Sequence, residues 1–309
     1  MFTGGRKMSE LPKRAKIYIP EETEGICGCI QIVHGMAEHQ GRYVPVAEFF
    51  RLNGFVVVTS DLRGHGDNVE SDEDLGFFND VEKLLDDVKE IFDYLKKEFP
   101  EKPMILIGHS MGSLISTCFF KLYGDMIDGL VLSGMPGQNP MASAGKALIR
   151  TMAIARGWRH RSKTIAGILN GPFSKAFPDD PDPFAWLSVD KENRKRYHED
   201  KKCGYMFTVS GYDTLLNLMI MAYGKVPFSG KRKKIPIRLI SGADDPCRVD
   251  DETFMKSVQL FKNAGYLNVT YELIPGQRHE IFNDTEREKT LTDLAVYLIN
   301  TICINKDKD

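Results

Sequence analysis

One serine in this chain lies between two glycines, in a setting that could make it a nucleophile. Gly108-His109-Ser110-Met111-Gly112 directly follows the apolar run 104–107 and directly precedes a segment with helical spacing. A strained turn between strand and helix would push Ser110 out of the carboxyl edge of a sheet, and it needs glycines because larger side chains would collide with neighbouring backbone. The Met111 amide, at the helix N-terminus, would point to where an oxyanion forms. We therefore predict Ser110 as a nucleophile and Met111 as an oxyanion donor.

A serine hydroxyl needs an imidazole to accept its proton and a carboxylate to orient that imidazole. Where a serine sits in such a turn, its partners follow in the order serine, acid, histidine. Of the seven histidines, His160, His198 and His279 follow Ser110, and the first two lie among charged residues in a region without clear strands. His279 alone follows a late predicted strand, at 269–274. We predict His279 as the base, with a surface histidine as the alternative.

Two adjacent carboxylates compete for the role of the acid. The predicted strand 237–241 leads into Gly242-Ala243-Asp244-Asp245-Pro246. Asp245 precedes a proline, which favours an extended backbone and a fixed side-chain direction. Asp244 would more readily cap a helix or face solvent. We therefore predict Asp245 as the acid.

Two further loops bring polar residues to the same predicted edge. His34-Gly35-Met36 ends the predicted strand 26–33, and this loop would donate the second oxyanion amide, from Met36. We interpret His34 as a residue that braces the loop. The segment from Asp61 to Gly66 follows the apolar run 55–59, and we expect it to shape the wall of the site rather than to act in catalysis.

Alternating β-branched runs and helix-period segments predict an α/β fold with a mostly parallel central sheet flanked by helices. The pattern breaks between about residues 135 and 234, which are richer in Pro, Gly and basic residues and show helical stretches without a clear strand. We predict a core formed by residues 1–134 and 235–309 and a helical cap, or lid, inserted at 135–234. The apolar residues of this insertion could line an acyl tunnel or form the cap's own packing core.

Composition narrows the classes of partner. With 41 basic and 43 acidic residues and a net charge of −2, no global field favours nucleic acid or an anionic membrane. The six cysteines form no CxxC pair, no secretory signal is apparent, and no run approaches the roughly 20 apolar residues of a spanning helix. We expect a cytoplasmic protein with reduced thiols and at most transient membrane-surface contact. The basic cluster 156–163 could attract a phosphate-bearing head group or be a solvated face.

These motifs resemble the lysophospholipase and monoacylglycerol lipase group of α/β hydrolases, often described as serine aminopeptidase-like. The resemblance extends over nearly the whole chain, with weaker agreement before Lys16 and at Ser113, where many members have glycine. It rests on the segments 34–39, 42–43, 61–66, 108–112, 242–245 and 278–280, and within the insertion on 184–188 and 203–208.

The resemblance implies a serine hydrolase that cleaves carboxylic esters of monoacyl lipids through an acyl-enzyme, in lipid metabolism. The triad would be Ser110, Asp245 and His279, with oxyanion amides at Met36 and Met111, and no metal or organic cofactor would be required. An aminopeptidase or thioesterase with the same triad is the alternative within enzymes. A non-catalytic ligand-binding protein of the same fold is the alternative outside them. Acyl-chain length, head group and oligomeric state are left open.

Overall fold

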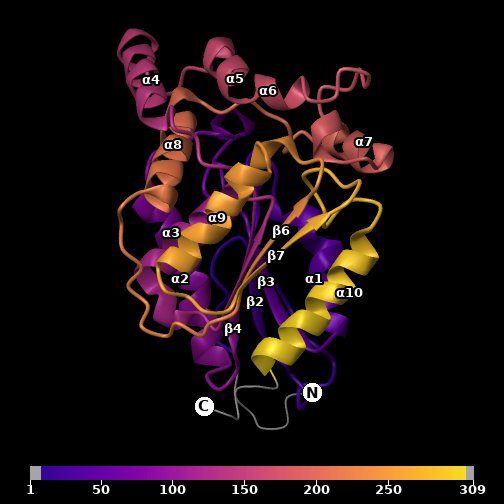
Figure 1. The fold of residues 1–309 in the computed structure, drawn as a ribbon. Helices are drawn as coiled ribbons and strands as arrows, with labels where there is room; N and C mark the ends of the chain where they lie inside the picture. The colour runs from indigo at the N-terminus through magenta and orange to yellow at the C-terminus, as the bar shows by residue number, and fades with distance from the viewer. Residues whose placement is uncertain (1–7, 304–309) are drawn as a thin grey trace.

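The computed structural model describes residues 8–303 of the chain, and in them a seven-stranded sheet forms the centre of the molecule (Figure 1). The strand order is β1-β3-β2-β4-β5-β6-β7; β1 pairs antiparallel with β3, and every other pair is parallel. The strands are β1 Ala15–Tyr18, β2 Gly28–Val33, β3 Phe55–Ser60, β4 Met104–His109, β5 Gly129–Ser133, β6 Ile237–Gly242 and β7 Val269–Ile274.

Helices cover both faces of this sheet (Figure 1). One face packs against α1 and α10, and the other against α2, α3 and α9, with α8 packed on α3. Their bounds are α1 Val44–Leu52, α2 Val81–Glu98, α3 Met111–Tyr123, α8 Val209–Tyr223, α9 Asp251–Asn263 and α10 Arg287–Leu298. The predicted α/β-hydrolase fold class is thereby confirmed.

Side-chain alternation explains why the strands are apolar throughout. In β4, Ile105 and Ile107 pack on the α1/α10 face, whereas Met104 and Leu106 pack on the opposite face. Successive side chains of a strand point to opposite faces, so a strand covered on both sides needs apolar residues at every position. No helix between residues 8 and 303 is both long and apolar enough to cross a membrane.

The parallel register brings the carboxyl ends of the strands to one edge. Val33 of β2 is level with Gly108 of β4, and His109 is level with Ser133 of β5. The loops that carry the predicted site residues therefore emerge side by side. Helices of the segment between β5 and β6 lie above this edge (Figure 1). They are α4 Ala142–Arg156, α5 Lys163–Leu169, α6 Gly171–Ser174 and α7 Lys191–Glu199.

The segment between β5 and β6 contains only helices and loops in the structure, as the sequence suggests. Its last helix, α8, packs along α3 rather than above the sheet edge. The buried Lys121 of α3 donates hydrogen bonds to the carbonyls of Met221 and Gly224, both 3.0 Å away, at the end of α8. The division into a core at 1–134 and 235–309 and a cap at 135–234 stays a prediction.

Candidate active site

Ser110 lies in a strained turn between β4 and α3. Its backbone has φ 54° and ψ −121°, a conformation that non-glycine residues rarely adopt. The flanking glycines allow this turn because a Cβ at Gly112 would lie 2.1 Å from the carbonyl oxygen of Val33, and one at Gly108 would lie 2.5 Å from that of Gly112. The turn projects Ser110 into a cavity at the sheet edge.

Asp245 and His279 meet at this edge although 34 residues separate them. His279 Nδ1 is 2.9 Å from Asp245 Oδ2, and both side chains are buried. Asp245 also accepts hydrogen bonds from the Cys247 amide at 2.8 Å and the Ser241 hydroxyl at 2.9 Å. A carboxylate only accepts, so Nδ1 carries the proton and the lone pair of the neutral ring is on Nε2. That Nε2 is buried and has no hydrogen-bond partner among residues 8–303.

Electrostatics tunes this pair. Burial disfavours the imidazolium, but the Asp245 charge and its hydrogen bond outweigh burial and raise the pKa of His279 above 6.5. For Asp245 burial acts in the other direction and would raise the pKa. The charge of the neighbouring His279 and its hydrogen bond outweigh burial, so the pKa of the carboxyl is lowered. The structure thus favours an ionised Asp245 and a histidine basic enough to accept a proton near neutral pH.

The loop after β2 lines the same cavity as Ser110. The Gly35 amide is occupied by Glu38 Oε1, 2.5 Å away, whereas Met36 and Met111 line the cavity with Ser110. His34 braces this loop as predicted: its Nε2 accepts a hydrogen bond from the Leu62 amide at 3.0 Å. It does not contact the reacting groups through any hydrogen bond that the structure shows.

The competing candidates lie elsewhere. Asp244 is exposed, and the His198 ring is bonded to Asp182 in the cap. His160 is only partly buried, before α5. Asp61 accepts hydrogen bonds from the Gln40 and Asp67 amides, both at 2.8 Å, so it shapes a loop as expected.

The cavity over Ser110 has a volume of about 830 Å³. Its walls come from the oxyanion loop, the segment after β5, the cap helices and the loops around Asp245 and His279. Several apolar cap residues predicted as tunnel candidates line it, namely Ile168, Leu169, Phe173, Leu215 and Met219. Others are packing residues, since Ile149, Ile165 and Leu218 are buried in the main hydrophobic core.

Sequence reasoning missed several side chains that surround the base. Trp186 packs its ring 5.1 Å from that of His279, and Arg42 forms an ion pair with Glu280, the residue after His279. Arg42 and Glu280 are 238 positions apart, so spacing alone could not pair them. The sequence indicated only that the two residues carry opposite charges and lie in segments on which the family resemblance rests.

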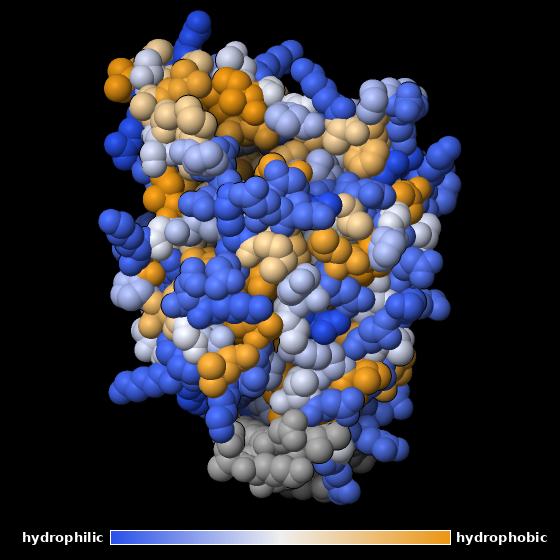
Figure 2. All heavy atoms as spheres, viewed as in Figure 1, coloured by the Kyte–Doolittle hydropathy of each residue, from blue (hydrophilic) through white to orange (hydrophobic). Residues whose placement is uncertain are grey.

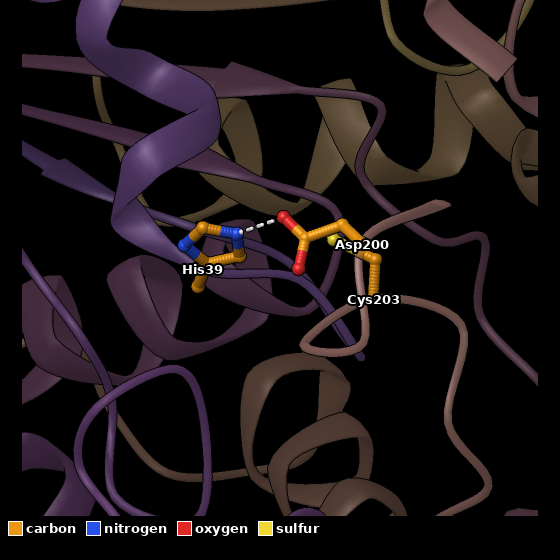
Figure 3. Close-up of side chains that lie close together, drawn as sticks. All are labelled: His39, Asp200 and Cys203. Atoms are coloured by element: carbon orange, nitrogen blue, oxygen red, sulfur yellow. Dashed lines mark hydrogen bonds and ion pairs between the residues drawn. The ribbon is translucent and has the colours of Figure 1, made fainter. Parts of the chain in front are cut away.

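Two clusters hold residue types that bind metals. Asp245, Cys247 and His279 form one, and His39, Asp200 and Cys203 form the other (Figure 3). In the second, the Gly41 amide donates to His39 Nδ1 at 3.1 Å, so the neutral ring carries its proton on Nε2 and donates to Asp200 Oδ2 at 2.7 Å. A protonated Nε2 has no lone pair for a metal. We interpret this cluster as a tie between the loop after β2 and the segment after α7.

Comparison with known proteins shows the family of the chain. The sequence profile described as serine aminopeptidase, S33, matches residues 25–286. The chain belongs to this family. It is 24% identical to a monoacylglycerol lipase of Mycolicibacterium smegmatis over 273 residues, which cover 88% of each chain. It is 27% identical to the phospholipase YtpA of Bacillus subtilis over 265 residues, which cover 84% of this chain and 90% of that relative.

A solved structure adds a relative in three dimensions. The carboxyl esterase of Bacillus coagulans superposes with a TM-score of 0.83 at 26% identity, covering 93% of this chain and 94% of the esterase. The S33 family membership and this superposition agree on the fold.

Proposed function

We propose that this protein hydrolyses carboxylic esters of monoacyl lipids, with Ser110 as nucleophile, His279 as base and Asp245 as acid. The observation that carries the proposal is the buried Nε2 of His279 in the same cavity as Ser110, which has no hydrogen-bond partner among the residues that the structure describes, with Nδ1 held by Asp245. The cavity's largely apolar walls and about 830 Å³ suit an acyl chain. The esterase, lipase and phospholipase relatives support the same reaction type.

The mechanism follows from this arrangement. His279 Nε2 accepts the Ser110 proton as the serine oxygen attacks the ester carbonyl, and the Met36 and Met111 amides stabilise the oxyanion. Asp245 stabilises the resulting imidazolium. His279 then gives the proton to the departing alcohol, and water hydrolyses the acyl-enzyme by the reverse sequence of proton transfers. The residues named here require no metal or organic cofactor.

An amide substrate is the alternative. An aminopeptidase recognises the substrate's amino terminus, usually through acidic residues, and the segment 179–182 offers three aspartates, Asp179, Asp180 and Asp182, for that role. In the structure, Asp180 and Asp182 both bind Arg194, at 2.6 and 3.3 Å, and neither lines the cavity. This pairing favours the ester over the aminopeptide substrate.

A substrate panel tests the proposal. We expect turnover of monoacylglycerols, lysophospholipids and p-nitrophenyl esters of graded chain length, and none of aminoacyl-nitroanilides. Ser110→Ala should abolish turnover, and Ser143→Ala, an exposed serine on α4, should leave it unchanged. Preferential turnover of the nitroanilides would replace the ester assignment with the aminopeptidase alternative.

Brief contact with a lipid surface is a further part of the proposal. Leu148, Ile154 and Trp158 are 45%, 90% and 47% exposed on and after α4, and Figure 2 shows hydrophobic side chains gathered over α4 and α5. Residues 135–178 include lysines and arginines but no acidic residue. Exposed apolar side chains beside basic ones are typical of surfaces that dock on anionic lipid. We also place the protein in the cytoplasm, where thiols are kept reduced, because its six cysteines form no CxxC pair.

A further inference from the structure

A buried polar network occupies the space between the oxyanion loop, the His279 loop and the cap. Arg42 is at its centre: it contacts Glu38 Oε2 at 3.0 Å, Glu280 Oε2 at 2.7 Å and Asn193 Oδ1 at 3.0 Å. The amide of Asn193 in turn donates to Glu280 Oε2 at 2.7 Å. The side chains of Arg42, Glu38 and Glu280 are 9%, 4% and 3% exposed. A planar guanidinium suits this place because it can donate to several acceptors at once.

Each member is attached to a different part of the site. Glu38 accepts a hydrogen bond from the Gly35 amide, so it fixes the backbone immediately before Met36. Glu280 follows His279 directly in the chain. Asn193 belongs to α7, which lies above the sheet edge (Figure 1). Arg42 therefore bonds directly to three residues that adjoin, respectively, the proposed oxyanion donor, the proposed base and the cap.

Backbone hydrogen bonds run parallel to this network. The Glu280 amide donates to the Leu187 carbonyl at 2.7 Å, and the His279 amide donates to the Trp186 carbonyl at 3.3 Å. On the oxyanion loop, the carbonyl of Ala37 accepts the Tyr197 hydroxyl at 3.0 Å. The segment 186–197 of the cap thus holds both catalytic loops.

The charges in the network act on the base as well. Glu38 and Glu280 are carboxylates near His279, and both raise the pKa of the imidazole. Arg42 offsets one of the two negative charges. Burial opposes ionisation of Glu38, but Arg42 above all outweighs it and lowers its pKa to about 2. Losing Arg42 leaves two buried carboxylates uncompensated beside the base.

We propose that Arg42 is a positioning residue: it holds Glu38 and Glu280 so that the Met36 amide and the His279 ring face one point beside Ser110, and Asn193 couples this alignment to the cap. The inference rests on the proposed function. It adds that the position of the cap helix α7 governs the chemical step and not only the entry of substrate.

The chain offers a matched control for Arg42. Arg238 also forms an ion pair with a glutamate, Glu272, and lies 4.6 Å from the Tyr297 ring centre, just as Arg42 lies 4.8 Å from that of Tyr197. Neither Arg238 nor its two partners lines the cavity over Ser110. Arg238→Gln therefore removes a similar ion pair away from the site.

The test measures kcat and KM for an ester substrate, and the rate at which a fluorophosphonate labels Ser110, in folded variants. A misplaced catalytic group can cost about 100-fold, so we expect Arg42→Gln to lower kcat and the labelling rate by about that factor, with little change in KM. Arg42→Lys keeps the charge and should recover part of the loss. Asn193→Ala, which leaves the ion pairs in place, should lower both rates by about tenfold.

The acidic limb of the pH–rate profile separates positioning from general loss of structure. Arg42→Gln should move this limb to higher pH, because the uncompensated carboxylates favour the imidazolium. Glu280→Gln should move it to lower pH. If Arg42→Gln and Asn193→Ala behave like Arg238→Gln in all three measurements, the positioning role is refuted. A wild-type protein that is labelled at Ser110 but hydrolyses no ester would overturn the proposed function while leaving the labelling test of Arg42 intact.

Discussion

His279 donates through Nδ1 to Asp245, 2.9 Å away, while its other nitrogen is buried in the cavity that Ser110 enters and has no hydrogen-bond partner within the described part of the chain. One bond therefore settles the tautomer and leaves the lone pair on the nitrogen that a base must use. Unpaired buried nitrogens are costly in a folded protein. The proposed proton transfer from Ser110 to His279 Nε2 explains why this nitrogen is left without a partner within the described residues.

The two neighbouring aspartates should respond differently to the same change. Asp245→Asn keeps the shape but removes the charge that orients His279, and in such triads this lowers kcat by about 10⁴-fold. Asp244→Asn changes an exposed carboxylate and should leave kcat within about twofold of wild type, as most surface changes do. Steady-state kinetics on a soluble ester compares the pair. Equal losses in both variants would contradict the assignment of Asp245.

The pH dependence of kcat/KM should follow the protonation of His279. The neutral ring is the active form, and Asp245 raises its pKa above 6.5, so activity should fall as the pH falls through an inflection above 6.5. Asp245→Asn should move the remaining activity's inflection to lower pH, because the charge that favours the imidazolium is gone. A wild-type inflection well below 6.5 would be inconsistent with the pairing.

The glycine after Met111 should tolerate no side chain. In Gly112→Ala the new Cβ would lie 2.1 Å from the Val33 carbonyl oxygen and 2.5 Å from that of His34, so the oxyanion loop must shift. We expect loss of several degrees in Tm and at least about 100-fold in kcat. Gly167→Ala is the control, because a Cβ there meets nothing within 4 Å and alanine favours the interior of helix α5. An unimpaired Gly112→Ala variant would show that close packing at this turn is unimportant.

Contact with lipid should depend on the exposed apolar residues of the cap. The inactive Ser110→Ala protein should sediment with vesicles of phosphatidylcholine and phosphatidylglycerol. Replacing Ile154 and Trp158 with serine should weaken binding about tenfold, since each removes apolar surface. Leu52→Ser is the control, because Leu52 is 74% exposed at the end of α1, away from the cap. Equal binding by all three proteins would remove the cap from the contact, and dissociation of a dimer by the cap changes would identify a second copy as the partner instead.

Much of the fold was predictable because local sequence and tertiary structure agree. Continuous apolar runs gave the buried strands, and the strand that was predicted at 26–33 begins at Gly28 in the structure, a shift of two residues that periodicity cannot detect. The edge strand β1, Ala15–Tyr18, is short and partly exposed, so it lacks a buried run that would have signalled it. The family resemblance is weaker before Lys16, and residues 1–7 of that stretch lie outside the described residues.

The site was predictable only where chain order limits the choices. Ser110, Asp245 and His279 each stand just after a predicted strand, so parallel topology brings them to one edge. The Arg42 network depends on contacts between distant loops and the cap. Arg42 and Asn193 are 151 positions apart, and nothing in local spacing indicates that they meet.

The most direct measurement of the central claim is to react the protein with a fluorophosphonate at neutral pH and locate the adduct by mass spectrometry. We predict one adduct, on Ser110, formed rapidly by the wild type and slowly by His279→Ala, together with loss of esterase activity in proportion to labelling. An adduct on another residue, or esterase activity that persists in Ser110→Ala, would contradict the account.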